Sequence, residues 1–133
     1  MIDFELTYRL FGSSAILIEW PQQIDLEINR DVHAFDVVIN STELHEFEES
    51  VPAYASLTLF FAHLDNPNEM ISSLKKLYSL RHKSVLPKKK WIIPVCYDSK
   101  FAIDLEVIAN ALKLKKEEII EMHTGSSYPV FFI

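Results

Sequence analysis

Hydrophobic periodicity alternates along this chain between the two-residue period of a strand and the longer period of a helix. Residues 5–11 alternate polar with apolar side chains, and residues 15–20 hold a β-branched run, so both segments are predicted to be strands. A turn at residues 12–14 separates them. Four further strands are predicted, at residues 50–54, 56–62, 91–97 and 128–133.

Helices are expected between the strand pairs, where apolar residues recur every three or four positions. Asp25 is the predicted N-cap of the first helix, and Asn66, followed by Pro67, is that of the second. A third helix is expected to begin near Asp104 and a fourth to cover residues 117–123. The inward-facing residues expected on the first and third helices are Ile28, Val32, Phe35 and Ile39, and Leu105, Ile108, Ala109 and Leu112. This order predicts an α+β fold: a two-layer sandwich with a mostly antiparallel sheet and helices on one face.

Length and charge limit what such a chain does. The 133 residues are room for one domain, and the net charge of −6 is unevenly distributed. Residues 1–50 hold eleven acidic and two basic side chains, whereas residues 51–133 hold eight and eleven. The first half therefore offers nucleic acid no basic surface, and acids on residues 117–123 oppose a DNA-reading role for the last helix pair. The basic cluster at Arg81, His82, Lys83 and residues 88–90, beside Trp91, is predicted to be a solvated loop.

Several further classes are disfavoured by composition. Two glycines are too few for a phosphate-binding loop, and no apolar run approaches the roughly 18–20 residues of a membrane span. Cys96 is the only cysteine, which indicates a reducing compartment and a cytoplasmic protein. Because Cys96 falls within a predicted apolar strand, its thiol is expected to be buried and unreactive.

Catalytic patterns are sparse. None of the five histidines has the spacing of a metal site, so no metal is expected. No serine lies in a nucleophile elbow. His123 is the most notable titratable group, because it lies at the end of a predicted helix; a purely structural role for it is the alternative. Residue chemistry alone thus predicts an α+β domain without a self-sufficient active site.

Several segments follow one another in an order that resembles a known family. They are GSSAILIE at 12–19, IDLEINR at 24–30, VPAYASL at 51–57, IPVCY at 93–97 with DLE at 104–106, EEIIEMHT at 117–124 and YPV at 128–130. Together they resemble the KipI/PxpB family, also called allophanate hydrolase subunit 1 or the carboxyltransferase subdomain C and D family. Two positions depart from it: Ser13 stands where aspartate is usual and Ala102 where glycine is expected, and no role is carried onto either.

The resemblance implies that residues 1–133 form the N-terminal α+β domain of a longer architecture, whose C-terminal cyclophilin-like domain is absent here. It implies two functions of different class. One is a subunit, of the B type, of ATP-dependent 5-oxoprolinase, which converts 5-oxoproline to glutamate. The alternative is a KipI-like inhibitor that binds a sensor histidine kinase, and a subunit of allophanate hydrolase or urea carboxylase type is a third reading.

We expect the domain to be a docking half of a composite site and to be inactive when isolated. ATP is expected in the full complex rather than on this domain. Tyr54, Tyr97 and His123 are the candidate site-proximal residues, since two phenols and one imidazole could bind or move protons; packing against the sheet is the alternative for the tyrosines. Expected partners are oxoprolinase subunits or a histidine kinase, without nucleic acid or membrane. Homo-oligomers are also expected, because unpaired strand edges template pairing.

Overall fold

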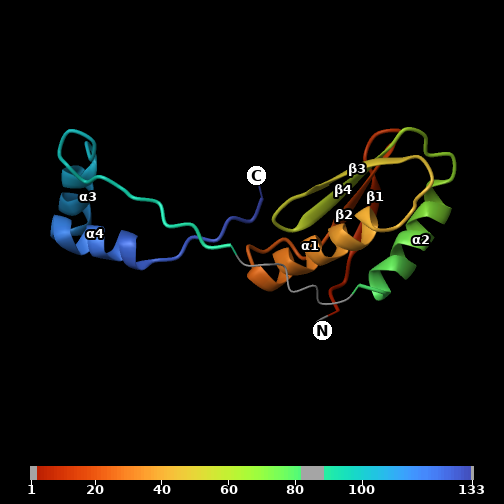
Figure 1. Ribbon diagram of the computed structural model, residues 1–133, viewed down its shortest axis with the longest axis horizontal. Helices are drawn as coiled ribbons and strands as arrows, with labels where there is room; N and C mark the ends of the chain where they lie inside the picture. Colours follow the sequence, from red (N-terminus) through yellow and green to blue (C-terminus); the bar gives the residue numbers. More distant parts are fainter. Residues whose placement is uncertain (1–2, 82–88, 133) are drawn as a thin grey trace. The chain divides into compact units, whose positions relative to one another are not determined.

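The computed structural model describes residues 3–81 and 89–132, which fall into two compact units (Figure 1). Unit 1 comprises residues 1–87 and 131–133, and unit 2 comprises residues 88–130. Unit 1 contains a sheet with two helices, and unit 2 contains two shorter helices.

The sheet of unit 1 has four antiparallel strands in the order β1-β2-β4-β3. Their bounds are β1 (Thr7–Leu10), β2 (Ala15–Glu19), β3 (Phe47–Pro52) and β4 (Ser56–Phe61). Ile18 of β2 lies opposite Tyr8 on one side and Leu57 on the other, which fixes which residues share a face. The antiparallel sheet confirms the predicted α+β class.

Two capped helices belong to unit 1, α1 (Leu26–Asn40) and α2 (Pro67–Ser79). The Asp25 carboxylate accepts hydrogen bonds from the backbone N–H groups of Glu27 at 2.7 Å and Ile28 at 3.1 Å. Asn66 accepts from the Glu69 N–H at 3.4 Å, and Pro67 occupies the first turn. Both N-caps predicted from the sequence are therefore confirmed.

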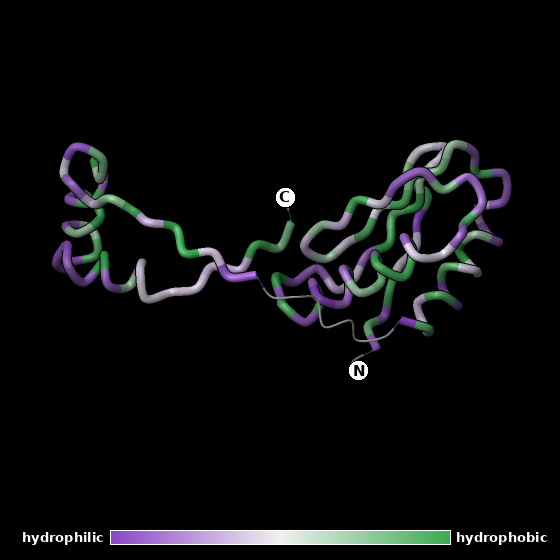
Figure 2. The backbone as a smooth tube through the Cα atoms, viewed as in Figure 1, coloured by the Kyte–Doolittle hydropathy of each residue, from purple (hydrophilic) through white to green (hydrophobic). Residues whose placement is uncertain are grey.

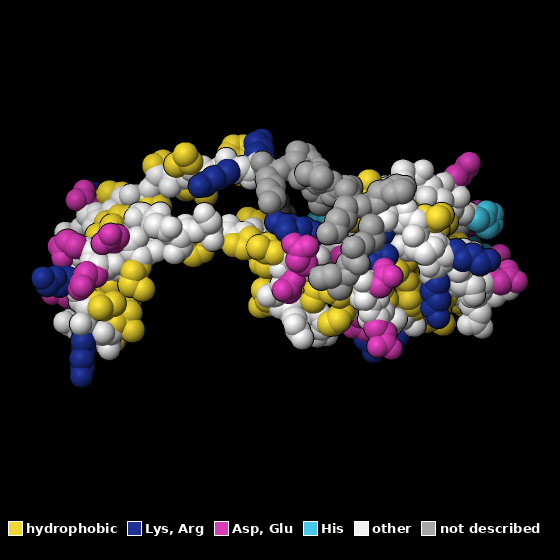
Figure 3. All heavy atoms as spheres, turned by 90° about the horizontal axis from the view of Figure 1, so that it is seen from below, with side chains coloured by type: hydrophobic (Ala, Val, Ile, Leu, Met, Phe, Trp, Pro, Cys, Tyr) yellow, Lys and Arg dark blue, Asp and Glu magenta, His cyan; other side chains and the backbone are white. Residues whose placement is uncertain are grey.

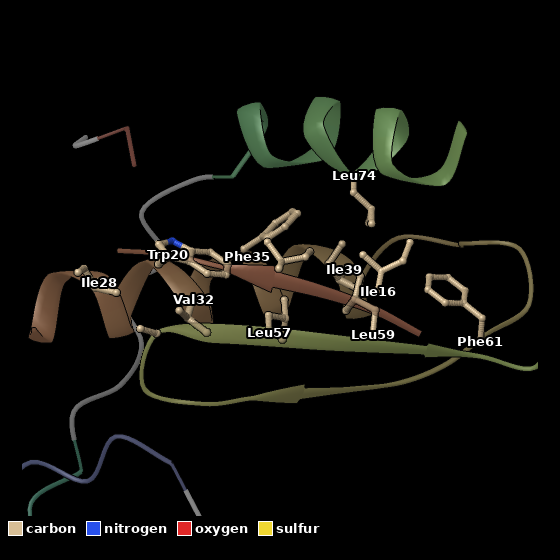
Figure 4. Packing of buried hydrophobic residues seen from close by; sticks show 12 residues of the cluster. Ile16, Trp20, Ile28, Val32, Phe35, Ile39, Leu57, Leu59, Phe61 and Leu74 are labelled. Carbon is tan, nitrogen blue, oxygen red and sulfur yellow. The ribbon is translucent and has the colours of Figure 1, made fainter. Parts of the chain in front are cut away.

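The core lies between α1, α2 and one face of the sheet (Figure 4). Alternate residues of β2 and β4 face the helices, as the period of two requires. The helical stripe of α1 predicted from its spacing supplies the facing layer. The largest fully buried side chains are Ile16, Ile18, Val32, Phe35, Ile39, Leu57, Leu59, Phe61 and Leu74.

Unit 2 contains α3 (Leu105–Leu112) and α4 (Lys116–Gly125). Few of its described side chains are buried. Among its described residues, Ala109 is the one buried apolar side chain. The expectation that Ile108 and Leu112 face inward is wrong, because Ile108 is 42% and Leu112 59% exposed, while Leu105 is half-buried. Hydrophobic stretches run along the extended segments of this unit (Figure 2).

Two predicted strands are wrong. Neither residues 91–97 nor 128–132 form a ladder with any described strand, and residue 133 lies outside the described residues. A strand is stabilised by its neighbour, and Pro94 and Pro129 each remove a backbone donor from these segments. Without a ladder to cover it, Cys96 is exposed, so its expected burial is also wrong.

The predicted solvated basic loop is wrong at Arg81, and its residues 82–88 lie outside the described residues. Its first member, Arg81, is buried at 3% exposure and belongs to the core of unit 1. Lys89 places its Nζ 3.9 Å from the centre of the Trp91 ring, an exposed cation–π contact. No helix in the described part of the chain is long and apolar enough to cross a membrane.

Candidate functional site

A buried polar cluster joins β2, α1 and α2 in unit 1. The Asp31 carboxylate accepts hydrogen bonds from Trp20 Nε1 at 2.8 Å, Tyr78 OH at 2.5 Å and Arg81 Nε at 2.7 Å. Arg81 also donates to the Tyr78 carbonyl at 2.7 Å and to Asp3 at 3.1 Å. A carboxylate that accepts hydrogen bonds from three different side chains anchors the elements that carry them.

The electrostatics of this cluster keep its phenol neutral. Burial, together with the hydrogen bond that Tyr78 donates to Asp31, raises the pKa of Tyr78 above its ordinary value. Burial likewise raises the pKa of Tyr8 to about 12, with Arg81 opposing the shift. Burial opposes the charge of Arg81, but Asp31 raises its pKa above the ordinary value. These groups therefore hold fixed protonation states at neutral pH.

Helix α1 also holds the end of the described chain. Asn29 Nδ2 donates to the Phe131 carbonyl at 2.9 Å, and His33 Nε2 lies 3.3 Å from the same oxygen. The Asn29 amide further contacts the carbonyls of Ala53 and Tyr54, each at 3.4 Å. One buried amide thus joins α1, the β3–β4 turn and the segment at Phe131 within unit 1.

Tyr54 lies in the β3–β4 turn, beside a shallow cleft. Its hydroxyl donates to Gln22 Oε1 at 2.9 Å, and Gln22 Nε2 donates to the Trp20 carbonyl at 3.1 Å. Gln22 lines a cleft of about 370 Å³ together with Glu5, Thr7, Glu19, Trp20 and Pro21. Glu19 is already paired with Arg9 at 2.5 Å. Tyr54 therefore orients a residue of this cleft rather than lining it.

Tyr97 and His123 are brought together in unit 2. The Tyr97 hydroxyl contacts His123 Nδ1, and the Tyr128 hydroxyl donates to the His123 carbonyl at 3.2 Å. His123 lines a second cleft, of about 300 Å³. Two of the three residues predicted to be site-proximal are thus in contact, while Tyr54 belongs to unit 1. That these residues serve a composite site stays a prediction.

Sequence reasoning did not find Asn29, Asp31 and His33. Asn29 and its partner Phe131 are 102 positions apart in the sequence, so no local spacing of residues indicates their contact. A polar residue next to the apolar positions of a helix is the signal that the sequence offers for a buried polar contact, and it does not identify the partner residue. Within residues 3–81 and 89–132, no three His, Cys, Asp or Glu side chains come together to hold a metal ion.

Comparison with known proteins supplies the family. The carboxyltransferase domain, subdomain C and D, matches residues 6–133. The chain belongs to this family. A curated relative, the B-type subunit of 5-oxoprolinase from Bacillus subtilis (strain 168), is 31% identical over 134 residues, which covers 92% of this chain and 56% of the relative. The present chain therefore spans little more than half the length of that relative.

Two solved structures are also similar. A conserved uncharacterised protein of Pyrococcus horikoshii matches with 31% identity and a TM-score of 0.51, covering 93% of this chain and 57% of the other. The N-terminal domain of the histidine kinase inhibitor KipI from Bacillus subtilis matches with 27% identity and a TM-score of 0.45, covering 59% of this chain and 84% of the other. The family match over residues 6–133 and the 31% identity to the B-type 5-oxoprolinase subunit confirm the KipI/PxpB resemblance that the sequence motifs indicated.

Proposed function

We propose that this carboxyltransferase-family domain is part of a subunit of ATP-dependent 5-oxoprolinase, of the B type, and contributes one half of a composite site. The observation that carries the proposal is the 31% identity to the B-type 5-oxoprolinase subunit across 92% of the chain. Chemistry is assigned to the assembled complex, where ATP would also be bound. With Gly12 and Gly125 as its only glycines, this chain has no glycine-rich phosphate loop.

The surface of unit 2 supports a docking role. Twelve large hydrophobic side chains are exposed among the described residues of this unit, including Ile92 at 90% and Ile93 at 77%. Figure 3 shows hydrophobic side chains open on the surface of the second unit. Contiguous apolar patches of monomers rarely exceed a few hundred Å² and larger ones mark interaction sites. A subunit that acts only in a complex is the kind of protein that carries such a surface.

Affinity capture tests the proposal directly. The tagged 133-residue chain is incubated with native extract of its source organism, and bound proteins are identified by mass spectrometry. Recovery of the other oxoprolinase subunits is expected. Ile92→Lys should reduce this recovery, because it places a charge on the apolar surface of unit 2, whereas Ile24→Lys is a matched change at an 80% exposed position of unit 1 and should not.

Two outcomes would overturn the proposal. Recovery of a histidine kinase in place of oxoprolinase subunits would favour the inhibitor function that the sequence left open. ATP hydrolysis dependent on 5-oxoproline by the purified chain alone would contradict the docking role, because the domain would then hold a complete site.

A further inference from the structure

Strand β1 forms one edge of the sheet in unit 1. Its neighbour is β2, and within residues 3–81 and 89–132 no strand pairs with its other side. The Phe11 N–H donates to the Ala15 carbonyl of β2 at 2.8 Å. Because backbone hydrogen-bonding groups alternate along an antiparallel strand, the odd-numbered residues of β1 direct theirs towards β2. The N–H and C=O groups of Tyr8 and Leu10 therefore point out from the edge of the sheet.

Side chains along this edge alternate between two faces. From residue 3 to residue 9, the odd-numbered side chains are exposed and the even-numbered ones are partly buried. The even-numbered side chains that pack against the core of unit 1 are Phe4, Leu6 and Tyr8. On the other face, Glu5 and Thr7 line the cleft of unit 1 that also contains Glu19. The edge thus continues in extended form before β1, with Glu5 and Arg9 two positions on either side of Thr7 on its exposed face.

The order of charges on this edge is self-complementary. Two antiparallel copies related by a two-fold axis at Thr7 place Glu5 of each chain opposite Arg9 of the other. The same register places Leu6 opposite Tyr8, so that their outward backbone groups exchange hydrogen bonds. A register centred on Arg9 would instead oppose two guanidinium groups, and one centred on Tyr8 would move Glu5 out of line with Arg9.

The groups that this register joins are free to take part in it. Glu5 has no ion pair among the described residues. Arg9 is paired with Glu19 but is 63% exposed, and a guanidinium has further N–H groups to donate. Leu10 is 54% exposed although it lies on the helix-facing side of the sheet. In this register Phe4 of the second copy lies opposite Leu10, which would remove apolar surface from water.

The other edge of the sheet, β3, lacks these properties. A register shift between Phe47 and Glu49 interrupts it, and Pro52 has no N–H to donate. Glu48 and Glu49 add two carboxylates without a basic residue on the strand. Bulges, proline and charge are the features that protect an edge strand against pairing. Pairing of β1 with β3 of another copy would also leave open ends, whereas pairing of β1 with β1 closes as a two-fold dimer.

We propose that β1 is the docking surface for a second copy of this chain, paired antiparallel about Thr7, so that the two sheets become one continuous sheet. Two Glu5–Arg9 pairs, one on each side of the two-fold axis, set the register. The proposal concerns unit 1 and goes beyond the docking role proposed for the surface of unit 2, on which it does not depend.

Disulfide cross-linking at the two-fold axis tests this register. Opposed residues of a non-hydrogen-bonded pair have Cα atoms about 4.5 Å apart, within the range of about 4.4–6.8 Å that a disulfide requires. Thr7→Cys in the 133-residue chain, with Cys96→Ser to remove the native thiol, should therefore form a covalent dimer under mild oxidation. Phe11→Cys in the same background is the matched control at a 58% exposed position of the same edge. Its two copies would lie about 27 Å apart, so cross-linking at residue 7 should be about tenfold faster.

An exchange of charges separates the register from folding. Glu5→Arg and Arg9→Glu each oppose like charges in the homodimer, so either one, added to the Thr7→Cys chain, should slow cross-linking about fivefold. Mixed in equal amounts, the two variants restore both opposite-charge pairs and should give mainly the heterodimer, which mass spectrometry distinguishes from the homodimers.

Far-UV circular dichroism shows whether each variant is folded. If Arg9→Glu fails to fold because it also loses its contact with Glu19, the comparison of residues 7 and 11 still decides. Equal rates of cross-linking at these two positions would overturn the proposal, and so would homodimers as abundant as heterodimers in a mixture of folded variants.

Discussion

Arg81 and Asp31 form a buried ion pair across 50 positions of sequence. Arg81 Nε lies 2.7 Å from Asp31 Oδ1, and the two side chains are 2% and 10% exposed. The guanidinium also stacks on the Tyr78 ring, with its carbon 3.4 Å from the ring centre. This pair fixes the chain after α2 against α1 and, through Trp20, against the end of β2.

Removing one partner of this pair should destabilise unit 1 strongly. Asp31→Ala leaves the Arg81 charge buried without its main counter-ion, and breaking buried pairs in this way costs about 3–5 kcal/mol. Arg30→Ala is the matched control, because the Arg30–Glu27 pair is exposed on the same helix and such pairs contribute at most about 1 kcal/mol. Urea unfolding of both variants, followed by far-UV circular dichroism, measures the difference. Equal midpoints would contradict the anchoring role.

How far the sequence predicted this fold depends on how local each signal is. The N-caps at Asp25 and Asn66 and the apolar stripe of α1 were predicted correctly, since caps and periodicity are properties of a few neighbouring residues. The strand at β3 begins earlier than predicted, at Phe47, where Glu46 adopts a positive φ of 57° and the register shifts between Phe47 and Glu49. A bulge of this kind has no clear sequence signal.

Strand pairing and contacts between residues far apart in the chain could not be predicted from the sequence. The strand predictions at residues 91–97 and 128–133 rested on composition alone, and composition does not supply a neighbouring strand. Asp31 is 11 positions from Trp20 and 50 positions from Arg81, and neither separation in the sequence indicates a contact. For the candidate site, side-chain chemistry pointed to Tyr54, Tyr97 and His123; the structure shows a contact between Tyr97 and His123, whereas Tyr54 belongs to unit 1. Which side chains line the cleft beside them depends on the packing of α3 and α4.

The N-cap of α1 should contribute measurably to stability. Asp25→Ala removes the carboxylate that accepts from two orphan N–H groups, and such caps contribute about 1 kcal/mol. Asp104→Ala is a matched control, because Asp104 precedes α3 without a capping hydrogen bond and its loss should change stability by less than about 0.5 kcal/mol. Thermal or urea unfolding compares the two, and a larger loss in Asp104→Ala would refute the assignment.

Tyr8 should make stability fall at alkaline pH. Burial raises its pKa in the folded protein to about 12, above the ordinary value of 10.0, so folding favours the neutral phenol. The contribution is complete below pH 10, where the unfolded chain is also protonated, and is lost as pH rises towards 12. The free energy of unfolding of the parent should therefore decrease more steeply from pH 10 to 12 than that of Tyr8→Phe. Parallel curves for the two proteins would show that the phenol is not buried as described.

The apolar surface of unit 2 should cause self-association in the absence of other partners. The twelve exposed large hydrophobic side chains among the described residues of unit 2 favour any contact that removes them from water, at about 25 cal/mol per Å². Light scattering should give a mass that rises with concentration, and Ile92→Lys should reduce this rise more than Ile24→Lys. A monomeric mass at every concentration would count against the oligomers expected from the sequence.

Cys96 provides a probe of the same surface. Its thiol is exposed between Val95 and Tyr97, so a disulfide reagent should modify the native chain within about tenfold of the rate for the denatured chain. A thiol buried in an apolar strand would instead react far more slowly. If unit 2 mediates association, the reaction should slow as protein concentration rises, because neighbouring apolar side chains become covered. Protection that is independent of concentration would mean that Cys96 is covered within a single chain, which would contradict the exposure seen here.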